Sequence, residues 1–393
     1  EEASDIHIEP QESKVRVRYR VDGILQHKTD LPSSMAAPLA ARIKVICKLD
    51  IAEKRRHQDG RIEARVLNKE FDLRVSTYAS MWGESIVIRV LSRSNAIDLN
   101  VLGFTPHHLS IFKTILERPS GIILVTGPTG SGKTTTLYSS VAYLNEQNKK
   151  IITAEDPIEY TIDGITQGQL ERKLDQTYTD FLKSMLRQDP DVLMIGEVRD
   201  KVAAEAVVEA ALTGHKVLTT FHTDDTTGAL LRLLDMGVET FLISSTVVSI
   251  IAQRLVRHLC PKCKKQYEPD EEVLSHYKLL RFNLDELTLY EPKGCLHCKY
   301  TGYKGRIAIH EILKLNDAIR DAILQRQTSH QIRGTARKKG NLISMREDGF
   351  YKAAQGLTSL EEVVRITARN EVDEQLPRTW DTLKILCETE ASD

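Results

Sequence analysis

One short segment contains the residues whose types and spacing indicate a chemical role most clearly. Residues 127–134 fit the phosphate-binding pattern G-x-x-x-x-G-K-[ST]. In such a segment the glycines let backbone N–H groups turn toward phosphate oxygens, a lysine reaches the β- and γ-phosphates, and a hydroxyl binds Mg²⁺. The sequence therefore predicts a nucleoside triphosphate site with ATP and Mg²⁺ as cofactors, built from Gly127, Pro128, Thr129, Gly130, Ser131, Gly132, Lys133, Thr134 and Thr135.

The flanks of this segment supply the expected context. Residues 122–125 are a β-branched and leucine run typical of a buried strand, and residues 135–144 carry apolar side chains at helical spacing. A strand, a glycine-rich turn and the positive end of a new helix together favour phosphate binding. The same residues in a loop without these flanks would be weak evidence.

Acidic residues follow two further predicted strands. Glu155 comes after residues 151–154, and Glu197 comes after residues 192–195. The carboxyl ends of parallel strands meet at one edge of a sheet, where working groups of such enzymes lie. Glu197 is a candidate Mg²⁺ ligand at longer reach or through water, and Glu155 is the better candidate for the general base that activates water. The two roles can be exchanged, because the sequence does not fix the reach of either side chain.

A histidine ends a third predicted strand. His222 follows residues 217–221, and a helix is expected from about Thr226. From this position His222 could sense the γ-phosphate and relay its loss to that helix. A purely structural histidine is an equally strong interpretation.

Four of the six cysteines form two C-x-x-C pairs: Cys260 with Cys263, and Cys295 with Cys298. Four thiolates in two pairs suit a closed, tetrahedral structural Zn²⁺ site, although the interval between the pairs is longer than usual. A redox role is the weaker alternative. Cys47 is expected in a core, and Cys387 in a C-terminal tail.

Composition bounds the remaining possibilities. The 393 residues are 41% hydrophobic and 28% charged with a formal net charge of -1, which describes two or three globular domains and argues against a dedicated polyanion binder. We find neither a membrane-span pattern nor a signal peptide, which favours the cytoplasm. The abrupt start at Glu1 suggests a fragment whose natural N-terminus lies upstream.

Periodicity divides the chain into a mixed α/β domain (1–97), a linker (98–106), a parallel α/β domain (107–370) with a metal-binding insertion at about 258–310, and a tail without periodicity (371–393). We expect helices at 35–49, 105–117, 179–187, 202–212, 226–236, 239–258, 317–325, 329–339, 345–355 and 359–367. In the first domain, strands are expected at 15–21, 61–66, 71–76 and 85–91, with a hairpin turn at Asn68.

With these residues identified, the chain resembles the secretion ATPases of type II secretion and type IV pilus assembly. Near the N-terminus, the resemblance rests on residues 3–10, 49–55 and 58–61. Further along the chain it rests on residues 127–134, called the phosphate loop below, an aspartate box at 155–159, an atypical Walker B segment at 186–200, and a histidine box at 213–215 and 221–224. The four cysteines resemble those of assembly ATPases, which retraction ATPases lack, and residues 295–306 look somewhat more like the type II secretion branch.

The resemblance implies a PAS-like N-terminal domain followed by a RecA-like P-loop ATPase domain with a small zinc-binding subdomain. It implies a homo-hexamer on the cytoplasmic face of the inner membrane, associated peripherally through an inner-membrane platform protein. Arg61 and Arg74 match arginines that reach the phosphates, and Arg89 does so less clearly, whereas a solvated strand face remains the simpler account of Arg16 and Arg18. Domain rotation would then couple ATP turnover to movement.

Other functions compete with an assembly motor. A retraction motor of the same superfamily is disfavoured by the four cysteines. A RecA-like nucleic-acid translocase is disfavoured by the near-neutral charge and by the absence of an aromatic and basic stripe, so no nucleic acid is expected. A non-catalytic scaffold is disfavoured because Lys133, Glu155 and Glu197 are all present.

Overall fold

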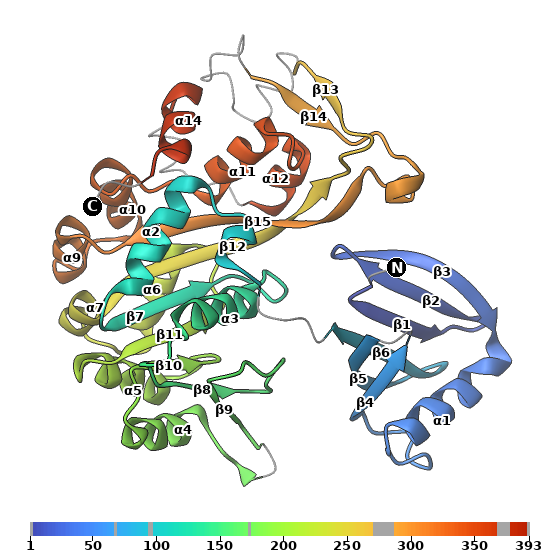
Figure 1. The fold of residues 1–393 in the computed structure, drawn as a ribbon. Helices are drawn as coiled ribbons and strands as arrows, with labels where there is room; N and C mark the ends of the chain where they lie inside the picture. Colours follow the sequence, from blue (N-terminus) through green and yellow to red (C-terminus); the bar gives the residue numbers. More distant parts are fainter. Residues whose placement is uncertain are drawn as a thin grey trace. The chain divides into compact units, whose positions relative to one another are not determined.

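The computed structural model describes residues 3–66, 69–92, 97–171, 174–269, 287–367 and 378–390. The chain divides into two compact units, Glu1–Asn95 and Ala96–Asp393 (Figure 1). Asn68, where a hairpin turn is predicted, lies outside the described residues. Among the described helices, none is both long and apolar enough to cross a bilayer.

The first unit is an antiparallel sheet with one long helix. Its strand order is β3-β2-β1-β6-β5-β4, and a core around Ala40, Val75 and Ile86 lies between the sheet and α1. Cys47, at the end of α1, is buried in this core as predicted. The elements are β1 (Asp5–Pro10), β2 (Lys14–Val21), β3 (Ile24–Pro32), η1 (Ser33–Met35), α1 (Ala36–Ile46), β4 (Gln58–Val66), β5 (Lys69–Ser80) and β6 (Gly83–Ser92).

The second unit is built on a seven-stranded sheet of order β15-β12-β7-β11-β10-β8-β9. Pairing is parallel from β12 through to β9, and β15 joins the edge antiparallel to β12. The strands are β7 (Gly121–Thr126), β8 (Ile151–Glu155), β9 (Thr166–Gln169), β10 (Val192–Ile195), β11 (Lys216–Phe221), β12 (Val247–Leu259) and β15 (Tyr303–Lys314). The predicted parallel α/β fold is therefore confirmed.

Helices cover both faces of this sheet, because each face carries its own apolar core. One core includes Phe112 of α2 and Val141 of α3, and the other includes Val207 of α5 and Leu230 of α6. The helices are η2 (Leu99–Val101), α2 (Pro106–Glu117), α3 (Lys133–Leu144), α4 (Tyr178–Met185), η4 (Leu186–Gln188), α5 (Lys201–Leu212), α6 (Thr226–Asp235), α7 (Thr240–Thr246), α9 (Asp317–Leu324), α10 (Ser329–Lys339), α11 (Met345–Ala354) and α12 (Leu360–Ile366).

The predicted helix at 239–258 is wrong. Only α7 is helical there, and β12 begins directly after it at Val247. The β-branched residues of β12 are buried because the strand lies between β7 and β15 with helices on both faces of the sheet. A strand buried on both faces has no alternation, so periodicity alone cannot separate it from a buried helix.

The expectation of an irregular tail is also wrong for its described part. Residues Trp380–Glu388 form α14, and Trp380, Leu383 and Cys387 are buried in a core shared with α11 and α12. Thr379 caps this helix, because its side chain accepts a hydrogen bond from the Thr382 N–H. Tertiary packing, rather than a long periodic pattern, stabilises so short a helix.

Candidate nucleotide site and tetracysteine site

The phosphate loop joins β7 to α3, as predicted. Gly127, Gly130 and Gly132 all have positive φ (149°, 79° and 90°), a conformation that residues with a side chain rarely adopt. A Cβ on Gly127 would lie 2.5 Å from the Gln253 carbonyl oxygen, so close packing also demands glycine there. Helix α3 begins at Lys133 and places its positive N-terminal end at the loop.

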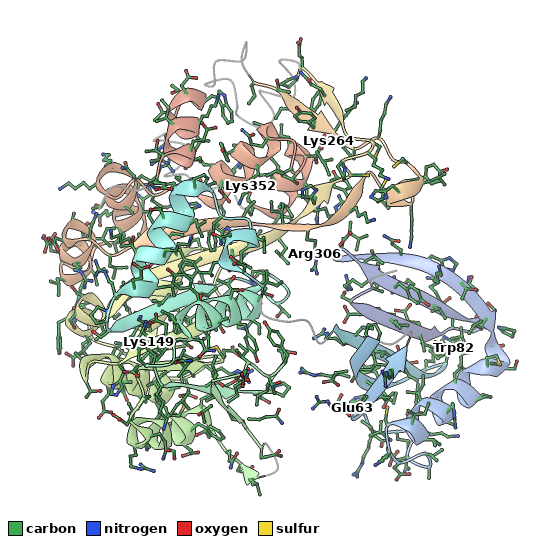
Figure 2. All side chains as sticks on the ribbon, viewed as in Figure 1. Glu63, Trp82, Lys149, Lys264, Arg306 and Lys352 are labelled. Carbon is green, nitrogen blue, oxygen red and sulfur yellow. The ribbon has the colours of Figure 1, made fainter. Side chains whose placement is uncertain are left out.

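A cavity of about 430 Å³ opens beside this loop and collects the predicted strand-end residues. Glu155, Glu197 and His222 line it together with residues 129–135 of the loop. Arg306 of β15, labelled in Figure 2, and Leu255 of β12 are further lining residues that sequence reasoning missed. The role of Gly127 and Pro128 is to position Lys133: their carbonyl oxygens accept hydrogen bonds from Lys133 Nζ (2.7 and 3.2 Å).

Glu155 is the most constrained acid at the cavity. Its side chain is nearly buried, and Thr153 Oγ1 (2.5 Å) and Gln167 Nε2 (3.1 Å) both donate to Oε1. The Tyr138 hydroxyl donates to Oε2, and burial beside Glu155 raises the pKa of Tyr138 well above its usual range. Parallel pairing of β8 with β9 sets Gln167 opposite Thr153, which explains how Gln167 reaches the carboxylate. The carboxylate therefore has one fixed orientation.

Glu197 belongs to a chain of polar side chains across the cavity. Its Oε1 lies 3.4 Å from His222 Nε2, and His222 Nδ1 lies 3.3 Å from Lys133 Nζ. Burial and then the charge of Lys133 lower the pKa of His222, so the ring is neutral at pH 7. A neutral ring fits this chain if Nδ1 accepts from the ammonium and Nε2–H donates to the carboxylate. His222 thus connects the phosphate loop with the second acid.

The first unit carries the predicted arginines on one sheet face. Arg61, Arg74 and Arg89 are successive cross-strand partners on β4, β5 and β6, so they form a row. Arg61 is paired with the buried Asp72, to which its Nε donates (2.7 Å). That these arginines reach the phosphates stays a prediction.

The four predicted cysteines meet although 31 residues separate the pairs. All four sulfur atoms lie within 4.8 Å of one another. The separations are 3.9 Å for Cys260–Cys295, 3.7 Å for Cys263–Cys298 and 3.8 Å for Cys295–Cys298. Zn–S bonds of about 2.3 Å in a tetrahedron would put sulfurs about 3.8 Å apart, so the donors fit Zn²⁺.

The chain around the cysteines is held to the body of the second unit. β12 ends one residue before Cys260, and β15 begins soon after Cys298. Strands β13 (Lys265–Tyr267) and β14 (Leu289–Glu291) pair beside them, and η6 (Leu296–Cys298) contains the last cysteine. Lys264, labelled in Figure 2, donates from Nζ to the Gly356 carbonyl (2.8 Å). The cysteines therefore lie at one end of the long antiparallel pair that β12 and β15 form.

Comparisons with known proteins identify the family of this chain. The family described as "Type II/IV secretion system protein" matches residues 1–365. The chain is 48% identical to the type II secretion system ATPase E of Vibrio cholerae serotype O1, over 93% of this chain and 72% of that protein. It is 44% identical to the type IV pilus assembly ATPase PilB of Thermus thermophilus, over 93% of this chain and 41% of that protein.

Solved structures show the same fold at low sequence identity. The Legionella pneumophila ATPase DotB superposes with a TM-score of 0.67 at 23% identity, covering 93% of this chain and 91% of that one. The pilus retraction motor PilT with bound ADP gives a TM-score of 0.63 at 23% identity, covering 95% and 96%. On the family match and the identities above, this chain belongs to the Type II/IV secretion system protein family and is an ATP-hydrolysing enzyme.

Proposed function

We propose that this ATPase powers assembly of a type II secretion pseudopilus or a type IV pilus, as a hexamer acting on an inner-membrane platform protein. The names of its relatives support the class of machine. The observation that carries the catalytic part is the convergence of Lys133, Glu155, Glu197 and His222 on one cavity. The test replaces the chromosomal gene by a Lys133→Ala allele: filament assembly should stop, while light scattering of the purified protein still reports a hexamer.

In the proposed reaction the loop N–H groups and Lys133 bind the phosphates, and Glu155 orients a water and accepts its proton. The water oxygen bonds to the γ-phosphorus as the bond to the β–γ bridging oxygen breaks and ADP departs. Thr134 and Glu197 both line the cavity and would hold Mg²⁺, which neutralises phosphate charge. The fixed carboxylate of Glu155 favours it over Glu197 as the base.

His222 would report the state of the γ-phosphate. It contacts Lys133 and Glu197, and the next residue, Thr223, donates from its N–H to Thr126 Oγ1 at the start of the loop (2.9 Å). Two residues further on, Asp225 caps α6 through Gly228 N–H (2.6 Å). If hydrolysis displaces Lys133 or Glu197, His222 would therefore move with them and shift the residues at the start of α6.

The arginine row supplies a prediction about coupling between the units. If Arg61 and Arg74 neutralise charge on the γ-phosphoryl, Arg74→Ala should lower kcat strongly, within the range of about 10³- to 10⁵-fold known for arginine fingers. Steady-state hydrolysis at saturating ATP checks this. Arg16→Ala, on another strand of the same sheet, is the control and should leave kcat within about twofold of wild type. Equal rates for Arg74→Ala and Arg16→Ala would contradict the assignment.

Nucleotide affinity should depend on pH through Lys133. Burial lowers the pKa of this lysine to about 8. Below pH 8 the ammonium is already formed, whereas above pH 8 nucleotide binding must also add a proton. A bound phosphate raises the pKa of Lys133. The affinity for nucleotide should therefore fall as pH rises from 8 to 9.5, with a slope that approaches about tenfold per pH unit. Titration calorimetry with Mg·ADP measures the slope, and an affinity constant over this range would refute the effect.

We also propose that the cysteines bind one structural Zn²⁺ per chain. All four ligand positions would be protein thiolates, which leaves no position for a catalytic water. The Gly302 N–H lies 3.2 Å from Cys298 Sγ and would stabilise a thiolate. The site would keep that end of the β12–β15 pair in one conformation.

Metal analysis tests this site. The purified protein should contain about one zinc per chain, and Cys298→Ser should lose it and unfold at a lower temperature. Cys387→Ala alters a buried thiol outside the cluster and should keep the metal. A folded, metal-free protein with all four thiols titratable would contradict the proposal.

The cysteine site also bears on whether the proposed motor assembles or retracts a filament. A retraction motor remains the alternative within the same superfamily, and the likeness to PilT shows the fold only. Because the four sulfurs form a compact cluster, the feature that favours an assembly motor is intact. Loss of filaments in a gene deletion supports assembly, whereas an excess of filaments would support retraction.

A further inference from the structure

A glutamine outside every recognised motif contacts the back of the phosphate loop. Gln253 lies on β12, seven residues before Cys260, and is 1% exposed. Its Nε2 donates to the Ser131 carbonyl oxygen (2.7 Å), and its Oε1 accepts from Thr136 Oγ1 (2.8 Å). One amide group therefore connects the loop with the first turn of α3 from the neighbouring strand.

The bond to Ser131 has a consequence for the peptide that follows. A trans peptide group is planar, with its C=O and N–H pointing in opposite directions. Because Gln253 holds the Ser131 carbonyl on its own side, the Gly132 N–H points away from Gln253. Gly132 lines the nucleotide cavity, so a donor that points away from Gln253 could meet a phosphate oxygen there. Gly132 has a φ of 90°, and this left-handed conformation is part of the same turn.

The loop glycines also pack closely against Gln253. A Cβ on Gly132 would lie 3.1 Å from Gln253 Nε2, and one on Gly127 would lie 2.5 Å from the Gln253 carbonyl oxygen. The side chain and backbone of Gln253 thus contact the loop near both ends. A polar group this deeply buried is costly unless both of its functions are satisfied, and here both are.

We propose that Gln253 is a positioning residue for the nucleotide site: its amide fixes the Ser131–Gly132 peptide so that the Gly132 N–H faces the phosphates. The inference rests on the proposed ATP site. It assigns to β12 a role in phosphate binding that the loop motif does not contain. Gln253 itself touches no substrate atom in this role.

Binding of Mg·ADP by calorimetry tests the proposal. In Gln253→Met, which keeps the length but loses both hydrogen bonds, affinity should fall at least about tenfold. Gln355→Met alters an exposed glutamine and should bind as wild type. Thr136→Val keeps the Gln253–Ser131 bond and removes the bonds of the Thr136 hydroxyl to Gln253 Oε1 and to the Gly132 carbonyl oxygen, so it should weaken binding less than Gln253→Met. Binding by Gln253→Met within twofold of wild type would overturn the proposal.

A second variant gives a readout that lost packing would not produce. Gln253→Glu places a carboxylate against the Ser131 carbonyl, and only its protonated form can donate there. Its affinity relative to wild type should therefore recover as pH falls from 8.5 to 6. Lys133 and His222 titrate in both proteins, so the ratio at each pH removes their effect. Since burial raises the pKa of a carboxyl, the recovery should occur above the usual range of glutamate.

The outcomes separate this inference from the proposed function. If wild type fails to bind Mg·ADP, the nucleotide site itself is wrong. If wild type binds, and the Gln253→Glu ratio stays constant over this pH range, only the role of Gln253 is wrong. Should Gln253→Met fail to fold, the pH ratio of Gln253→Glu decides the question.

Discussion

Replacing Lys133 by alanine is expected to abolish detectable ATP hydrolysis, with kcat reduced at least about 10²- to 10³-fold. Among the described residues that line the cavity, Lys133 is the one lysine, and its ammonium also donates to the carbonyl oxygens of Gly127 and Pro128. Removing it would delete the proposed phosphate contact and loosen the loop whose backbone N–H groups are proposed to bind the phosphates. Nucleotide affinity should therefore fall together with kcat.

Lys149→Ala provides the matched control for this experiment. Lys149, labelled in Figure 2, precedes β8 and pairs with Glu146 (2.6 Å) near the surface. Its loss should leave hydrolysis within about twofold of wild type, because exposed ion pairs contribute little. Thermal unfolding of both variants would show whether the Lys133 effect is local. Hydrolysis by Lys133→Ala at the rate of the control would exclude this cavity as the ATP site.

The second large effect is expected at Glu155. Glu155→Gln keeps the shape of the side chain but cannot accept a proton, so turnover should fall by about 10²- to 10⁴-fold while nucleotide binding is retained. Thr153 and Tyr138 are hydroxyl donors that can rotate to accept from the new amide, which preserves the local geometry. Single-turnover hydrolysis and Mg·ADP binding separate the two effects.

Glu117→Gln is the control for Glu155→Gln. Glu117 also accepts from a tyrosine hydroxyl, that of Tyr143 (2.8 Å), but it lies at the surface. Its substitution should change neither binding nor turnover. Wild-type turnover in Glu155→Gln would remove Glu155 as the base and move the assignment to Glu197. A Glu197→Gln variant that needs a higher Mg²⁺ concentration for half-maximal activity would support the division of roles proposed above.

Much of the fold followed from local patterns. Strands β7, β8, β10 and β11 are short apolar runs bounded by glycine or polar residues, and the helices after them carry apolar residues at helical spacing. The two errors have different causes. β12 is buried on both faces and therefore lacks the alternation of a half-buried strand. Helix α14 does carry apolar residues at helical spacing, at Trp380, Leu383 and Cys387, but its 9 residues are too few for that spacing to identify a helix.

The features of the functional site also fall into two groups: those predicted from local sequence and those found only in the tertiary structure. The identity of the phosphate loop, the acids at strand ends and the paired cysteines were determined by the sequence, because each is a local spacing with a specific chemistry. Two features, by contrast, were decided only by tertiary structure: His222 connecting Lys133 to Glu197, and Gln253 bracing the loop from β12. The contacts of His222 with Lys133 and of Gln253 with Ser131 join residues 89 and 122 positions apart, and the order of strands in the sheet, which no local spacing encodes, brings them together.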